Sequence, residues 1–225
     1  MTMLKSVAAM IRDKEAPMQM VATLPELVKA AKEHFISHLA GTDRMGMSSL
    51  LERLEKTSFF KDPASINYHS AHDGGLLLHS VGVHCLLKDI VSIVGNHPPL
   101  TPNTIAISAL LHDICKIGCY EVKEKFRKDK NDRWEKYPGY EWVEESFPFG
   151  HGEKSVDLIS RYIDLTEQEK LLIRWHMGPM TTGDGNDFYK ICARFPEVAL
   201  LHSADLMHSK VFEPQKVIEP LVGIL

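Results

Sequence analysis

The sequence predicts an all-α helical bundle with one inserted β-hairpin, and three observations lead to this prediction. Apolar residues recur at three- and four-residue spacing through most of the chain, as they do on the buried face of a helix. One segment, at about residues 119–146, instead alternates apolar and polar residues, which is typical of strands. Capping residues, glycines and prolines separate the helical segments from one another.

The composition is that of a globular protein, with 225 residues of which 44% are hydrophobic and 25% are charged. A chain of this length can bury one substantial core, so we expect a single domain over residues 1–225. The formal net charge of -4 gives no overall basic field, which argues against a nonspecific nucleic-acid or anionic-membrane binder and leaves a local basic patch open.

The expected compartment is the cytoplasm, and no membrane partner is expected. Four cysteines are too few for a disulfide scaffold, and charged residues from Arg12 to Glu15 interrupt the first apolar run, so no secretory start is visible. No stretch approaches the ~18 uninterrupted apolar residues of a membrane-spanning helix.

Two helices are predicted before the region that carries the motifs. The first covers about residues 24–39, where Thr23 can cap the helix and Pro25 suits its first turn. A shorter one follows at residues 48–56. Further helical segments are expected from 166 to 176, behind a capping box of Thr166 and Glu169, and at the C-terminus, near 217–225.

Four helical segments and the helix behind that capping box each carry a histidine or an aspartate. A helix that carries His79 begins at Gly74-Gly75 and runs to Gly95, and the helix that carries His112 and Asp113 begins at Thr101-Pro102. His151 begins a helix that ends near Tyr162, and His176 ends the helix behind the capping box. Asp205 lies on a helix that follows a loop at 181–187.

The predicted hairpin carries a local excess of positive charge. Residues 123–136 hold seven basic side chains against four acidic ones, together with Trp134 and Tyr137. This surface could guide an anionic substrate. An equally good interpretation is a solvated hairpin with a small hydrophobic underside.

Polar residues on apolar stripes predict a buried metal site. His79 falls in line with Leu76 and Val83, and Asp205 falls in line with Leu201. Burying an unpaired carboxylate is costly, and a cation is the simplest compensation. A single histidine on an apolar face is more often a hydrogen-bonded core residue than a ligand, so the prediction rests on the whole set.

The candidate metal ligands are His79, His112, Asp113, His151, His176 and Asp205. Four of them, His79, His112, Asp113 and Asp205, would suffice for one ion with positions left for water and substrate. If Asp113 bridges, two ions fit, one held by His79, His112 and Asp205 and the other by His151 and His176. The sequence leaves both arrangements open.

Two lysines are candidate phosphate contacts. Lys116 follows His112 by one turn and Lys154 follows His151 by three residues, so each ammonium is predicted near the face of its ligand, where it would suit a phosphate oxygen. Lys116 could equally complement a helix C-terminus. Cys115 and Cys119 have the spacing of a metal pair, but no second thiol pair completes a tetrahedral set, so we assign them to packing.

Five short segments, in order, resemble the motifs of the HD-domain superfamily of metal-dependent phosphohydrolases. They are Gly74-Gly75-Leu76-Leu77-Leu78-His79, Leu110-Leu111-His112-Asp113-Ile114-Cys115-Lys116, Gly150-His151-Gly152-Glu153-Lys154-Ser155, Trp175-His176 and Leu201-His202-Ser203-Ala204-Asp205. The resemblance covers about residues 68–208, with helical extensions at both ends. The first segment looks most like the branch with a 3′-5′ exoribonuclease, and the hairpin looks like uncharacterised HD proteins of gut bacteria and phages.

The resemblance implies roles for individual residues. His79, His112, Asp113 and Asp205 become core ligands, and His151 and His176 become ligands of a second metal. Related proteins often have a His-His pair where this chain has Trp175-His176, so His176 is matched to the second histidine. His72 takes the place of a substrate-contacting histidine, and it could equally cap the helix or bond to an aspartate.

The sequence therefore predicts an HD-domain phosphohydrolase that uses one or two divalent ions to cleave a phosphomonoester or phosphodiester. The expected partner is a nucleotide, another small phosphorylated substrate or a short oligonucleotide. Asp113, Lys116, Lys154 and His72 are the candidate catalytic residues. Imidazole and carboxylate ligands favour Mn, Fe, Co, Ni or Zn over Mg. Two alternatives are an HD-type di-iron oxygenase and a catalytically silent module that binds nucleotides.

Overall fold

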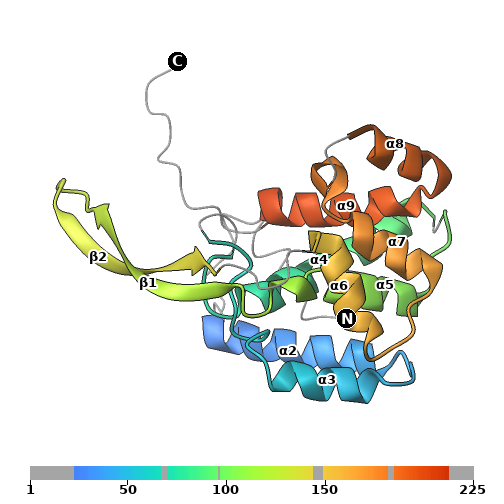
Figure 1. Cartoon of the computed structure of the whole chain (residues 1–225), viewed down its shortest axis with the longest axis horizontal. Coiled ribbons are helices and arrows are strands. Elements are labelled where there is room, and N and C mark those ends of the chain that lie inside the picture. Colours follow the sequence, from blue (N-terminus) through green and yellow to red (C-terminus); the bar gives the residue numbers. More distant parts are fainter. Residues whose placement is uncertain (1–22, 67–69, 96, 144–148, 182–184, 213–225) are drawn as a thin grey trace, which may run out of the picture.

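α-Helices form the body of the protein, and one β-hairpin projects from it (Figure 1). The computed structural model describes residues 23–66, 70–95, 97–143, 149–181 and 185–212. The elements are α2 (Leu24–Ala40), α3 (Met47–Glu55), α4 (Gly75–Ile93), α5 (Pro102–Leu111), η1 (Ile114–Lys116), β1 (Tyr120–Lys128), β2 (Trp134–Trp142), α6 (His151–Ser160), α7 (Glu167–Trp175), η2 (Gly178–Thr181), α8 (Gly185–Arg194), α9 (Glu197–Met207) and η3 (His208–Phe212). This architecture confirms the predicted all-α bundle with an inserted hairpin.

Helix α4 lies at the centre of the bundle, where it contacts α2, α5 and α9. Gly74 precedes it with a left-handed backbone, φ 74°, which glycine adopts without strain. Among the described helices, α4 alone is long and apolar enough to cross a membrane by those two criteria. Ten of its nineteen residues are buried, which accounts for its composition as that of a core helix.

Two apolar clusters hold the helices in place. The larger one joins α2, α3, α4 and α5 through side chains such as Phe35, Leu54, Leu77 and Leu110, all of which have no exposed surface. The smaller one joins α4, α5, α7 and α9. Close packing of this kind leaves little room for the helices to shift, so side chains at their ends keep defined positions.

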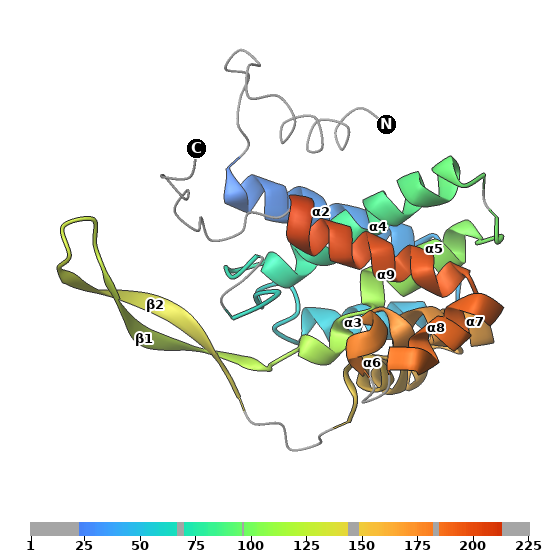
Figure 2. The ribbon, with the colours of Figure 1, turned by 90° about the horizontal axis from the view of Figure 1, so that it is seen from above.

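The hairpin is a regular antiparallel pair that extends away from the helices (Figure 2). Its register runs from Tyr120 opposite Trp142 to Lys128 opposite Trp134, which agrees with the insertion predicted at 119–146 as far as Val143. In the turn, the Asp129 carboxylate accepts hydrogen bonds from two backbone N–H groups. Residues 144–148 lie outside the described residues.

One helix differs from the prediction. Helix α8 begins at Gly185, inside the segment predicted as a loop at 181–187, and no helix was predicted there. Phe188 and Ile191 of this helix pack against Trp175, so the helix forms around a small apolar cluster of its own. The Gly, Asp and Asn residues at its start favoured a loop. The predicted terminal extensions, including the helix at 217–225, fall outside the described residues.

Candidate metal centre

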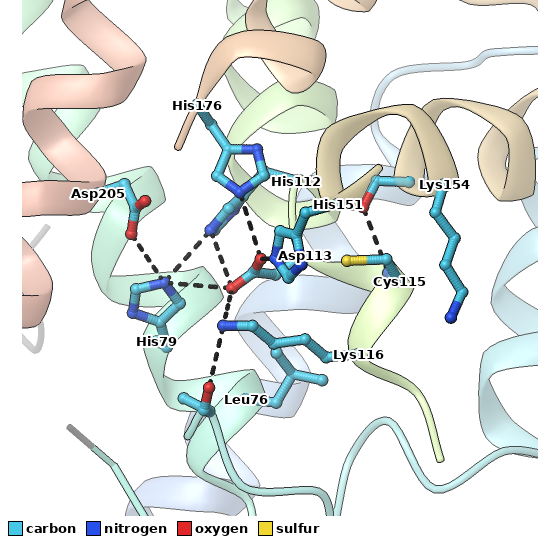
Figure 3. A network of polar contacts seen from close by, with 12 residues as sticks. Leu76, His79, His112, Asp113, Cys115, Lys116, His151, Lys154, His176 and Asp205 are labelled. Carbon is cyan, nitrogen blue, oxygen red and sulfur yellow. Dashed lines mark hydrogen bonds and ion pairs between the residues drawn. The ribbon is translucent and has the colours of Figure 1, made fainter. Parts of the chain in front are cut away.

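The structure brings all six predicted metal ligands together (Figure 3). They come from five places in the bundle. Helix α4 supplies His79, the segment after α5 supplies His112 and Asp113, and the start of α6 supplies His151; His176 follows α7, and α9 supplies Asp205. His79, His112, Asp113 and His176 are buried, with at most 2% of their surface exposed. The side chains of His151 and Asp205 are 27% and 14% exposed, so the centre reaches solvent at these two residues.

Asp113 is the hub of the centre, because its two carboxylate oxygens face different pairs of imidazoles. Oδ2 lies 3.6 Å from Nε2 of His79 and 3.5 Å from Nε2 of His112. Oδ1 lies 2.8 Å from Nε2 of His151 and 3.4 Å from Nε2 of His176. This placement is the one expected of a carboxylate that bridges two cations.

Asp205 completes the first of the two groups. Its Oδ1 lies 3.1 Å from Nε2 of His79, which in turn lies 3.2 Å from Nε2 of His112. Nitrogen ligands of one tetrahedral zinc ion, each at 2.0–2.1 Å from the metal, are about 3.3 Å apart. The donor atoms of His79, His112 and Asp205 are therefore already spaced like ligands of a single ion.

The backbone at His112 and Asp113 differs from the prediction that one helix carries both residues. Helix α5 ends at Leu111, and His112 is its C-cap. Asp113 leaves the helical conformation, with φ −106° and ψ 16°, before the short helix η1. Adjacent helical residues diverge by about 100°, so a continuous helix would separate the two side chains; the turn lets both reach the same centre.

His112 and His176 are oriented in the same way at the ends of their helices. Each ring donates its Nδ1–H to a carbonyl three residues earlier, that of Ala109 at 2.8 Å and that of Ile173 at 2.7 Å. Nε2 is thereby turned into the centre and, in the neutral ring, carries a lone pair. Nε2 of His176 is buried and has no hydrogen-bond partner among the described residues. A buried nitrogen of this kind is a suitable ligand for a cation.

Among the described residues, Lys116 is the one basic side chain besides the imidazoles that contacts Asp113 directly. Its Nζ lies 2.6 Å from Oδ2 of Asp113 and donates to the carbonyl of Ala64 at 2.9 Å. Burial opposes ionisation of Asp113, but the charges of Lys116 and His112 outweigh it, so the pKa of Asp113 is well below its usual value. Burial also disfavours the ammonium, yet Asp113 keeps the pKa of Lys116 above its ordinary value.

A second carboxylate and a histidine complete the charges of the centre. Burial would raise the pKa of Asp205, but the hydrogen bond from His79 and the nearby imidazoles lower it below its usual value. Burial would lower the pKa of His151, but Cys115 and Asp113 raise it to about 9. Two ionised carboxylates beside one ammonium and four imidazoles suit divalent cations.

Two predicted catalytic residues are not part of this cluster. Nζ of Lys154 lies 3.9 Å from Sγ of Cys119 and points away from Asp113 (Figure 3). His72 lies in the turn before α4, where its Nδ1 is 3.0 Å from the carbonyl of Asp73. Of the contacts expected for His72, the structure shows a hydrogen bond to an aspartate, made to the backbone. The roles of both residues in catalysis stay predictions.

Two neighbours of the centre were missed as functional candidates. Cys115, which was assigned to packing despite its metal-pair spacing with Cys119, is buried, and its Sγ lies within 4.8 Å of ligand atoms of Asp113 and His151. The ring of His208 lies 5.5 Å from that of His79, between centroids. A Cβ at Gly82 would approach Nε2 of His208 to 1.7 Å, so this glycine makes the space for the ring. Asp205 and His208 are one turn apart, which was the available signal.

Comparison with known proteins agrees with this geometry. The family model described as HD domain matches residues 76–209, which is more than half of the chain and includes all six candidate ligands. No curated protein and no solved structure matches the chain. The predicted superfamily is thereby confirmed: the chain belongs to the HD-domain family, whose members are generally metal-dependent phosphohydrolases.

Proposed function

We propose that the protein is a phosphohydrolase that cleaves a phosphomonoester or phosphodiester bond of a nucleotide or short oligonucleotide. The position of Asp113 carries this proposal. Its carboxylate lies between two groups of imidazoles, and Lys116 contacts it from outside both groups. A centre with this donor set and an adjacent ammonium suits phosphoryl chemistry, because the negative oxygens of a phosphate need both.

Two ions account for the donor atoms better than one. A single ion held by His79, His112, Asp113 and Asp205 would leave the orphaned Nε2 of His176 without a partner. In the two-ion arrangement, His151 and His176 share Oδ1 of Asp113 and form the second set. The bound ions would polarise the phosphoryl group and lower the pKa of a bound water toward ~7. The donor set favours Mn, Fe, Co, Ni or Zn over Mg.

The protein side chains orient the reactants. Lys116 holds the carboxylate of Asp113 through its 2.6 Å contact, and its ammonium can offset charge that builds on a phosphate oxygen. The hydrogen bonds from His112 and His176 to backbone carbonyls keep their rings from turning. A substrate can approach the centre where His151 and Asp205 are exposed.

The hairpin is tied to the same region at its base. Tyr120 begins β1, and its hydroxyl lies 3.4 Å from the carbonyl of Ala64, which also accepts from Lys116. Tyr140 of β2 donates to Oδ1 of Asp73 at 2.6 Å, in the turn before α4. These contacts support a role for the hairpin in guiding an anionic substrate toward the centre.

The test is product release by the manganese-loaded chain across nucleoside monophosphates and triphosphates, cyclic dinucleotides and short RNA and DNA oligomers. Asp113→Ala is measured alongside, and its fold is checked by circular dichroism. We expect the parent to release product and Asp113→Ala to be inactive.

Equal turnover by a folded Asp113→Ala protein would overturn the proposal. Silence of a metal-loaded parent across the panel would also overturn it. Oxygen uptake with iron, absent with manganese, would then identify the di-iron oxygenase, and tight nucleotide binding without turnover would identify a regulatory module.

A further inference from the structure

A second cluster of metal-binding side chains lies between α2 and α4. His34 and His38 are four residues apart on α2 and therefore lie on one face of that helix. His84 and Cys85 are neighbours on α4. We propose that His34, His84 and Cys85 bind a thiophilic divalent ion of the zinc class, at a site separate from the centre around Asp113.

The donor atoms of these residues converge. Nε2 of His34 lies 2.9 Å from Nδ1 of His84, and the ligand atoms of His34, His84 and Cys85 lie within 4.8 Å of one another. His84 is 1% exposed, whereas His34 and Cys85 are half-buried. Two imidazole nitrogens and one thiolate form a set that zinc binds well.

His38 supports the ring of His34. Its ring stacks on that of His34 at 3.9 Å between centroids, with an interplanar angle of 25°. Its Nδ1 donates to the carbonyl of His34 at 2.9 Å, so the orientation of the His38 ring is set by the helix backbone. We therefore assign His38 as a positioning residue, not a ligand.

The interaction between the facing nitrogens of His34 and His84 depends on what lies between them. Without a hydrogen, each nitrogen would point a lone pair at the other. Two neutral rings can place one N–H in the 2.9 Å gap, which makes an ordinary hydrogen bond. For a cation to bind both nitrogens, that hydrogen must move to the other nitrogen of its ring, and the Cys85 thiol, as the third donor, must release its proton to solvent. The experiment must distinguish these two states.

The proposed site lies on a different face of α4 from the candidate metal centre, and it would link α4 to α2. His84 follows His79 by five residues on α4, which turns its side chain by about 140° about the helix axis, toward α2. Helix α2 lies outside residues 76–209, to which the family model matches. An ion held by His34, His84 and Cys85 would attach this additional helix to the family core.

The first test is titration of the full, metal-free Cys115→Ser chain with Co²⁺, followed by the thiolate-to-cobalt charge-transfer band in the near ultraviolet. This background removes the thiol near Asp113, and Cys192 of α8, half-buried like Cys85, is the matched control. We expect the background and its double variant with Cys192→Ser to show the band, and the double variants with Cys85→Ser or His34→Gln to lose it. His38→Ala should keep the band with affinity weakened about tenfold, as expected for loss of a supporting contact.

The second test uses Zn²⁺ and thermal unfolding in the Asp113→Ala background, where the other centre is disabled. Added Zn²⁺ should raise the melting temperature of Asp113→Ala and leave that of the double variant with Cys85→Ser unchanged. In the presence of a chelator both proteins should melt at similar temperatures. This control excludes misfolding of the double variant as the reason for its missing Zn²⁺ shift.

A charge-transfer band that survives when Cys85→Ser is added to the Cys115→Ser background, or one that disappears when Cys192→Ser is added, would overturn the proposal. So would an equal Zn²⁺ shift in the two proteins. Because both tests read metal binding at Cys85, their outcome is independent of whether the protein hydrolyses phosphate.

Discussion

The candidate metal centre and the hairpin both carry many charges, but they arrange them in opposite ways. In the centre, Asp113 is 2% exposed and contacts side chains from α4, α6 and α7 as well as Lys116. On the hairpin, pairs such as Lys136–Glu124 and Arg127–Glu135 join neighbouring strands in solvent, with every partner more than 40% exposed. Charges in the centre are shared across the fold, whereas those of the hairpin are paired locally.

This difference determines what a substitution should cost. A buried charge has lost its hydration, so removing one member of the set leaves the others unpaired in a poorly solvated site. An exposed pair exchanges its contact for water at little cost and is screened by salt. Matched substitutions in the two regions should therefore differ greatly in effect.

The largest effect is expected for Asp113→Ala compared with Asp132→Ala in the hairpin turn. Loss of the carboxylate that faces both imidazole groups should lower turnover by at least about 1000-fold and reduce metal content. Asp132→Ala, which removes only an exposed partner of Lys128, should retain both. Product release measures the turnover of each variant, and elemental analysis measures its metal content. Comparable losses of both quantities in the two variants would contradict the difference drawn between the centre and the hairpin.

A stability effect of about 3 kcal/mol is expected for Arg44→Ala, because its carboxylate partner is buried. Arg44 donates two hydrogen bonds to Glu169, at 3.0 and 2.8 Å, and the Glu169 side chain has no exposed surface. The matched control is Arg161→Ala, whose pair with Asp157 lies on the surface of α6 and should contribute at most about 0.5 kcal/mol. Urea unfolding should separate the two, and equal midpoints would refute the account.

Lys116→Ala should lower turnover about 100-fold, since its ammonium is the one lysine charge that contacts Asp113 among the described residues. Lys136→Ala, a hairpin lysine of similar type, should change turnover on a small phosphomonoester by less than about twofold. The steady-state kcat of both variants is the measurement. A normal kcat for folded Lys116→Ala would remove this residue from the mechanism.

The smallest effect is expected for the hairpin lysines, and it tests whether they help to bind an anionic substrate. The triple variant Lys128→Ala, Lys130→Ala, Lys136→Ala should raise KM for a short oligonucleotide roughly fivefold at low salt and leave kcat unchanged. The difference from the parent should disappear at high salt, because exposed charges are screened. An unchanged KM at low salt would instead identify the hairpin as a solvated surface without a role in binding.

Much of the centre was predictable because local patterns encode it. The order of His, His-Asp, His, His and Asp along the helices was sufficient to select six residues that the structure brings together. The one-turn spacing of Lys116 from His112 predicted an ammonium near the site, and in the structure Nζ of Lys116 contacts Asp113. The same argument did not hold for Lys154, whose long side chain turns toward Cys119 instead.

The rest depended on tertiary contacts that no local pattern reports. Because α5 ends at Leu111, Asp113 can turn toward three imidazoles from other elements, those of His79, His151 and His176. The approach of Cys115 to His151 and the contact of His34 with His84 join residues that are far apart in the sequence. Helix α8 was hidden because its glycine and polar first turn resembles a loop.

The central claim is that Asp113 lies between two metal ions, and diffraction from crystals of the manganese-loaded chain at the manganese absorption edge tests it most directly. We predict two anomalous peaks about 3.5–4 Å apart. One should lie near His79, His112 and Asp205, and the other near His151 and His176. A single peak among His79, His112, Asp113 and Asp205, with no ion bound to Nε2 of His176, would contradict the account.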